Sequence, residues 1–195
     1  VVLTEGAQTI NGNKTFATLL TGTAVGTVTT GGTTVAAEHG DGVDHLTVLT
    51  CTAFAVGTAG NSTDLAIGAS LYTFPAAAIM VENASVKGIF TKPSLGTITD
   101  GEVGLGSVVG VGAVDTIAEV GATSGDVMRG LATGSYVLGT TVFTGASTPI
   151  TTGDVTTVAT GGVKTVFLNL AATWPATADA VTFTGVVTIR WRAIS

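Results

Sequence analysis

The last part of the chain alternates between apolar and polar side chains, and this alternation constrains the fold more than any other feature of the sequence. From Val181 to Ala193 one set of alternate positions is mostly apolar and includes Trp191, while the other set is mostly Thr and Arg. A period of two over this length indicates an extended strand of about 40 Å. One face of the strand is expected to be buried and the other to meet water, as in an antiparallel sheet.

The composition extends this expectation to the rest of the chain. Gly fills 28 of 195 positions, and Gly with the β-branched residues Thr and Val disfavours helix, whereas Thr and Val fit strands. Many short strands without helical segments between them favour an all-β fold, specifically a jelly-roll-like antiparallel β-sandwich of two four-stranded sheets. The further strand-like runs cover residues 46–56, 65–67, 71–75, 79–90, 136–144, 155–160 and 164–170.

Some details within these runs are more specific. Four apolar residues of the first run share one parity of a strand: Leu46, Val48, Phe54 and Val56. Asn83 and Gly88 are candidate bulges or turns. The Gly-rich stretch 96–130 carries several acidic residues and is expected to be a long loop. The single cysteine, Cys51, lies in an apolar run and is expected to be a buried, unreactive thiol.

The first 45 residues differ from the rest of the chain. They are rich in Gly and Thr and contain one aromatic residue, Phe16. This segment is too short to bury its own apolar face, so residues 1–45 are expected to form an extended N-terminal arm and residues 46–195 the sandwich. Phe16 and Leu19 are then candidate contacts with another subunit or surface. Deletion of residues 1–40 is expected to leave a folded core that no longer binds its partner.

A polar segment at the end of this arm holds both histidines of the chain. Metal ions use such ligands, so the weak metal-site candidates are His39, Asp41, Asp44 and His45. Their spacing matches no His-Glu-x-x-His motif and no calcium loop, and a polar connector between arm and core is the alternative. Four residues near the C-terminus are interface candidates. Trp174 and Trp191 are expected in the core or at a subunit interface. Arg190 and Arg192 lie on the wet strand face, which is expected to be solvated, and the alternative is that they pair with an acidic neighbour across a subunit interface.

Charge and motifs exclude several classes of function. Seven Lys and Arg stand against 13 Asp and Glu, without a basic run, so nucleic acid is not an expected partner. The uncharged stretches are interrupted by Thr and Gly, so no membrane partner is expected either. A dinucleotide loop, a phosphate-binding Gly-Lys-Ser/Thr and a Gly-x-Ser-x-Gly elbow are all missing from the sequence. We therefore expect no enzymatic activity and no cofactor.

Two segments resemble proteins of tailed bacteriophages. Residues Gln8 to Phe16 (QTINGNKTF) resemble a strand-turn-strand repeat of phage fibre and spike proteins. A longer set of patterns between Asp64 and Trp191 resembles head proteins of marine tailed phages: DLAIG at 64–68, LYTFP at 71–75, KPSLG at 92–96, TVFLNLA at 165–171 and GVVTIRW at 185–191.

The resemblance implies a virion structural protein. In this interpretation the chain is a capsid decoration or cement protein that binds the major capsid protein on the capsid exterior, as a homotrimer, and stabilises the shell. The low charged fraction of 10% suits a surface that faces other subunits. The alternative is a tail-fibre or head-fibre adhesin module that binds host glycans, and the two resemblances leave head and tail both open.

Overall fold

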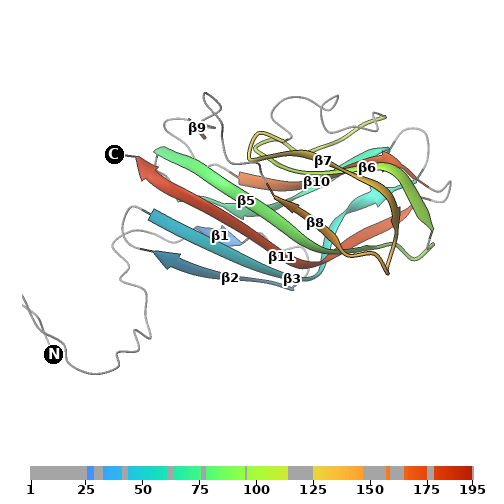
Figure 1. Ribbon diagram of the computed structural model, residues 1–195, viewed down its shortest axis with the longest axis horizontal. Helices are drawn as coiled ribbons and strands as arrows, with labels where there is room; N and C mark the ends of the chain where they lie inside the picture. Colours follow the sequence, from blue (N-terminus) through green and yellow to red (C-terminus); the bar gives the residue numbers. More distant parts are fainter. Residues whose placement is uncertain are drawn as a thin grey trace, which may run out of the picture.

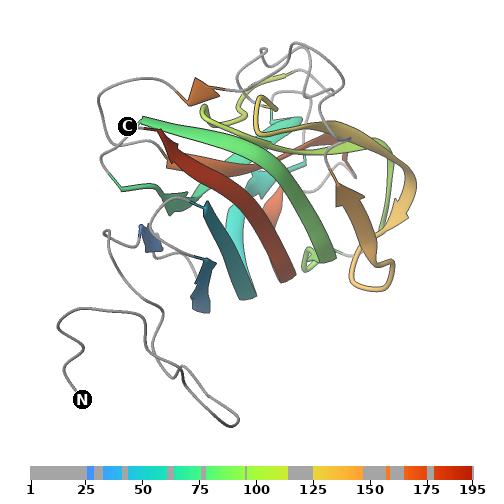
Figure 2. The same ribbon diagram turned by 60° about the vertical axis from the view of Figure 1, so that its left-hand side comes forward.

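Two antiparallel sheets pack face to face in this chain (Figures 1 and 2). The computed structural model describes residues 26–28, 33–40, 44–60, 64–75, 78–94, 96–113, 125–146, 157–158, 165–174 and 178–194. Sheet A has the strand order β1-β4-β10-β6-β7, and sheet B has the order β2-β3-β11-β5-β8, with β9 beside β5. The strands are β1 (Thr27–Val28), β2 (Thr33–Gly40), β3 (Asp44–Ala59), β4 (Ala66–Thr73), β5 (Ala78–Thr91), β6 (Thr97–Gly106), β7 (Met128–Val137), β8 (Phe143–Ala146), β9 (Thr157–Val158), β10 (Thr165–Thr173) and β11 (Asp179–Ile194).

Eight of these strands form four nested antiparallel pairs. Strand β6 pairs with β7, β5 with β8, β4 with β10, and β3 with β11. The chain therefore resembles one long hairpin, rolled up so that successive pairs alternate between sheets A and B. This arrangement is a jelly roll, and the all-β jelly-roll sandwich expected from the sequence is confirmed. Strands β1 and β2 extend the two sheets beyond the predicted four strands each.

The core lies between the sheets and is built by the predicted alternation of β11. Val181, Phe183, Val187, Ile189 and Trp191 are buried, while their neighbours along the strand are exposed or half-buried. These side chains meet the apolar residues of sheet A, among them Leu168 and Leu170 of β10. Burial of this apolar surface is the main favourable term in folding. Cys51 also lies in the core, and burial raises the pKa of its thiol, as expected for an unreactive cysteine.

Bulges in β3 and β5 change which residues face the core. In β3, Thr52 and Ala53 lie opposite the single residue Thr184 of β11, and Ala53 has a φ of 52°. The extra residue shifts the alternation, so Leu46 faces outward although Phe54 has the same parity and is buried. The shared parity of Leu46, Val48, Phe54 and Val56 therefore does not mean a shared face. In β5 a similar irregularity makes Glu82 the extra residue, since Asn83 lies opposite Arg190 and Val81 opposite Trp191. The bulge is therefore next to the candidate Asn83, whereas the candidate Gly88 pairs regularly with Gly185.

Three boundaries differ from the expectation. The stretch 96–130 is not one long loop but contains β6 and the start of β7, because Val103 and Leu105 alternate with glycines and bury their side chains in the core. Residues 136–144 span a turn between β7 and β8, not one strand. The sandwich begins before residue 46, since β1 and β2 are paired within the sheets. Residues 1–25 of the expected arm lie outside the described residues.

The outer side of sheet A is covered by the chain itself. Residues 107–113, here called the crossing segment, follow β6 and pass over β10 to reach β4. The Gly112 carbonyl accepts hydrogen bonds from Leu65 N (2.9 Å) and Ala66 N (3.0 Å) at the end of this path. Over β10, the buried Asn169 side chain accepts from Gly110 N (2.8 Å) and donates to the Val108 carbonyl (2.9 Å). Both the oxygen and the nitrogen of the Asn169 side-chain amide therefore hold the crossing segment in place.

Candidate functional site: an open sheet face

Within the described part of the chain, the outward side of sheet B has no comparable cover. Three rows of side chains cross it in register: Val35, Thr50 and Val186; Ala37, Val48 and Thr188; His39, Leu46 and Arg190. Val35 is 61% exposed and Val186 is 38% exposed, and the two lie in the same row. We call this surface the open face; it also includes Ser85, Lys87, Glu82, Asp44 and Arg192.

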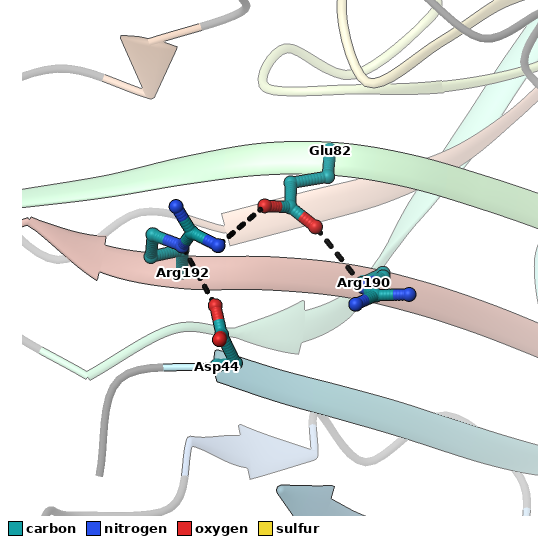
Figure 3. A network of polar contacts seen from close by, with 4 residues as sticks. All are labelled: Asp44, Glu82, Arg190 and Arg192. Carbon is teal, nitrogen blue, oxygen red and sulfur yellow. Dashed lines mark hydrogen bonds and ion pairs between the residues drawn. The ribbon is translucent and has the colours of Figure 1, made fainter. Parts of the chain in front are cut away.

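Charged residues gather at one end of the open face and pair with one another. Arg190 Nε lies 3.0 Å from Glu82 Oε2, and Arg192 lies between Glu82 and Asp44. The Arg192 Nε–Asp44 Oδ1 distance is 2.6 Å, and the Arg192 Nη2–Glu82 Oε1 distance is 3.3 Å. Figure 3 shows these four side chains side by side on β3, β11 and β5. Two cations and two anions form a network that is neutral as a whole.

The structure thus gives Arg190 and Arg192 acidic neighbours within their own chain. The sequence alone leaves open an acidic partner on another subunit. Glu82 is not among the candidate residues, because it sits at the β5 bulge, where parity does not tell which face a side chain takes. Its position next to the predicted bulge residue Asn83 is the one signal that could have raised the question.

A polar cluster ties the two sheets together behind the open face. The Glu38 carboxylate of β2 accepts hydrogen bonds from the hydroxyls of Thr47 (2.8 Å) and Tyr72. Trp191 Nε1 donates to Thr47 Oγ1 at 2.8 Å, and Gly26 N donates to the Tyr72 hydroxyl oxygen at 3.1 Å. Burial and the adjacent Glu38 carboxylate raise the pKa of Tyr72 well above its usual range. The cluster keeps Tyr72 neutral and couples β2 to β4 across the core.

Three of the four metal-site candidates, His39, Asp44 and His45, are described by the structure, and they do not form one site. His39 is exposed on the open face, whereas His45 is buried and stacks on Trp191 with ring centroids 4.0 Å apart. Asp44 pairs with Arg192, and Asp41 lies outside the described residues. Across the residues that the structure describes, no three His, Cys, Asp or Glu side chains come together in a way that could hold a metal ion. In the described structure, His45 serves as a core aromatic.

The two tryptophans take the first of the two roles left open by the sequence. Trp191 is buried between His45 and Phe74, so it has no surface to offer a partner. Trp174 is buried at the end of β10 and donates its Nε1 hydrogen to the Leu65 carbonyl at 2.8 Å, with the Lys92 ammonium 5.8 Å from its ring centroid. Phe16 and Leu19 lie outside the described residues, so their interface role stays a prediction.

The fold and the open face define a jelly-roll β-sandwich with one covered and one exposed sheet. Comparison of the chain with protein families, curated proteins and solved structures finds no match in any of the three. The described part of the chain contains no helix long and apolar enough to cross a membrane. A functional proposal therefore depends on the surface of the molecule and on the resemblance in the sequence.

Proposed function

We propose that this chain is a non-enzymatic structural protein of a tailed-phage particle, which binds the outer surface of the capsid as a homotrimer and stabilises the shell. The major capsid protein is the partner. Stabilisation follows from mass action, because a protein that binds only the assembled shell shifts the equilibrium toward it. No cofactor takes part, and the site of action is the capsid exterior.

The open face is the observation that carries this proposal. Val35 and Val186 are exposed in the first row of the open face and Leu46 in the third, with Ala37 and Val48 in the row between them. The nearby Arg190, Arg192, Glu82 and Asp44 are already paired with one another. Contiguous exposed apolar surface on a protein marks an interaction site. A sandwich with such a face is suited to a lasting contact with another protein. The segments that resemble phage proteins favour a phage particle as the assembly in which this contact is made.

The N-terminal segment supplies the proposed tether to the shell. Since β1 and β2 belong to the sheets, a deletion through residue 40 would remove part of the sandwich and break the Glu38 contacts. The sharper test deletes residues 1–25. We expect this variant to stay folded and to lose binding to capsids. Full occupancy of shells by the truncated protein would contradict the tether.

The experiment that tests the function is quantitative mass spectrometry of separated heads and tails from the phage that encodes the chain. We expect the chain on heads, in a copy number that is a multiple of three and is comparable with that of the major capsid protein. A few copies on tails, together with binding of the purified protein to a glycan array, would favour the adhesin alternative instead.

A further inference from the structure

We propose that the open face of sheet B is the surface through which three copies of this chain contact one another. This inference deepens the proposed homotrimer and rests on it. It names the surface that forms the trimer, which neither the resemblance nor the sequence pattern identifies. It also separates that surface from the part of the chain that reaches the shell.

The first support is the difference between the two outer sides of the sandwich. The crossing segment covers the central strand β10 on the outer side of sheet A, where Asn169 and Ala171 are fully buried. The central strand of sheet B instead exposes Val186 and Arg190 to solvent. The described chain supplies its own cover for one sheet, so the other is the side left for a neighbouring molecule.

The second support is the size of the open face. Four strands spaced about 4.8 Å apart, with their side chains, span about 20 Å, and the eight-residue rise from Thr184 to Arg192 spans about 27 Å. The product is on the order of 500 Å² per copy, so three copies would bury about 1,500 Å² in total. Each of the three pairwise contacts would bury about 500 Å² of this total. A copy that leaves the trimer breaks two contacts at once and exposes about 1,000 Å², which is the lower limit for a stable interface.

The third support is the distribution of charge. The open face carries Lys87, Arg190 and Arg192 against Asp44 and Glu82, whereas the whole chain has 7 basic and 13 acidic residues. If the open faces turn toward a common three-fold axis, the described acidic residues on or beside sheet A, Asp64, Glu102 and Asp126, lie away from that axis, where like charges are far apart and solvated. Arg190, Arg192, Glu82 and Asp44 can be covered with their charges still paired, and Lys87 lies outside this network on β5.

These features select a second copy over a partner of opposite charge. A surface whose Arg and acidic side chains already satisfy one another does not attract a strongly charged protein. It fits another surface made of Val, Ala and Thr, and the open face of a neighbouring copy is such a surface. In a cyclic trimer each copy contacts its two neighbours through two different parts of one continuous face.

The test uses the full chain, four single variants and sedimentation velocity. Val186→Glu and Val35→Glu place a carboxylate on the open face. Val108→Glu and Val111→Glu are matched controls on the crossing segment, since Val108 is 46% and Val111 64% exposed, against 38% for Val186 and 61% for Val35. Circular dichroism and a cooperative thermal transition establish that each variant folds. If Val186→Glu fails to fold, Val35→Glu on the edge strand β2 carries the test.

We expect sedimentation velocity to give the unmodified chain and both control variants a mass of about three times the 19.2 kDa of one chain. The two open-face variants should sediment as monomers, with the concentration needed for assembly raised about 100-fold, because assembly would bury an unpaired carboxylate. Trimers formed equally well by the open-face variants would overturn the inference and leave the homotrimer in place. A monomeric unmodified chain would also overturn it, even if that chain is found on capsids, in which case the decoration function stands.

Discussion

The two sheets differ in what covers their outward faces. Each sheet presents one face to the core, so its other face must meet solvent, another part of the chain or another molecule. Sheet A covers its central strand β10 with its own crossing segment, and β10 is buried on both faces over residues 168–172. Sheet B leaves its outer side to Thr, Val and a paired charge network. We infer that the central strand of sheet A is covered within one chain, whereas the outer side of sheet B is covered by a neighbouring copy in the proposed trimer.

The largest expected effect is on the free energy of unfolding, when a central residue on the outer side of sheet A is compared with one on the outer side of sheet B. Asn169→Ala removes the acceptor of Gly110 N and the donor to the Val108 carbonyl, and it leaves a buried backbone group without its partner. Such losses cost about 2–3 kcal/mol in the free energy of unfolding. Thr188→Ala, at the centre of the open face on β11, should change it by less than about 0.5 kcal/mol. Urea denaturation of both variants checks the difference.

Equal effects of the two substitutions would break the comparison. A large loss from Thr188→Ala would mean that the open face is already structured by contacts within one chain. A small loss from Asn169→Ala would mean that the crossing segment contributes little to the stability of sheet A.

The second prediction concerns the space beneath the crossing segment. A Cβ added at Gly68 would lie 2.0 Å from Asn169 Oδ1 and 3.1 Å from Gly110 N, so the amide that fastens the segment must move. We expect Gly68→Ala to cost about 1–3 kcal/mol. A double-mutant cycle isolates the cause: in an Asn169→Ala background the same substitution should cost clearly less. An unchanged cost would assign the strain to other atoms.

The fold class could be predicted from the sequence, because the hydrophobic pattern of each strand indicates which of its faces are buried. The alternation of β11 marks one buried and one open face, and the more continuous apolar run of β10 marks a strand covered on both sides. The bulges at Ala53 and Glu82 could not be predicted from such patterns. One extra residue in a strand makes all the side chains beyond it point to the opposite face of the sheet.

The charge network could not be predicted for a related reason. Arg192 meets Asp44 and Glu82 through strand neighbours that are far away in the sequence. Only the nested pairing of β3, β11 and β5 brings them together. From the sequence, Arg190 and Arg192 are expected on a solvated strand face or in pairs with acidic residues of another subunit, whereas Glu82 and Asp44 of the same chain are their partners here. The candidate metal residues failed as a group because neighbours on a strand, such as Asp44 and His45, point to opposite faces.

The third prediction tests the cluster that joins the two sheets. Burial and the Glu38 carboxylate raise the pKa of Tyr72, so the folded protein keeps this phenol protonated at a pH where the unfolded chain loses the proton. A raised folded pKa contributes stability that is complete below the ordinary value of about 10 and is lost as the pH rises above it. The expected slope is a loss of about 1.4 kcal/mol per pH unit above pH 10.

Tyr136 and Cys51 are also buried groups with raised pKa values, so the total slope has more than one source. The informative quantity is therefore the difference between the unmodified chain and Tyr72→Phe, followed by urea denaturation from pH 8 to pH 11. The Tyr72→Phe variant should lose stability less steeply above pH 10. Parallel curves for the two proteins would show that Tyr72 ionises equally in both states and that Glu38 does not hold it neutral.

The smallest expected effect concerns the charges of the open face. Arg192 and Asp44 have side chains that are 43% and 46% exposed, so water screens their attraction despite the short 2.6 Å contact. Exposed pairs contribute about 0.2–1 kcal/mol, and Arg192→Gln should cost no more than that in the monomeric Val186→Glu background, with a cost that shrinks at high salt. In the assembled protein the same substitution should cost more, because covering the open face removes water from Glu82 and Asp44 and leaves them short of a cation. Measuring Arg192→Gln in both backgrounds thus compares one network before and after assembly, and equal costs would show that the network lies outside the contact between copies.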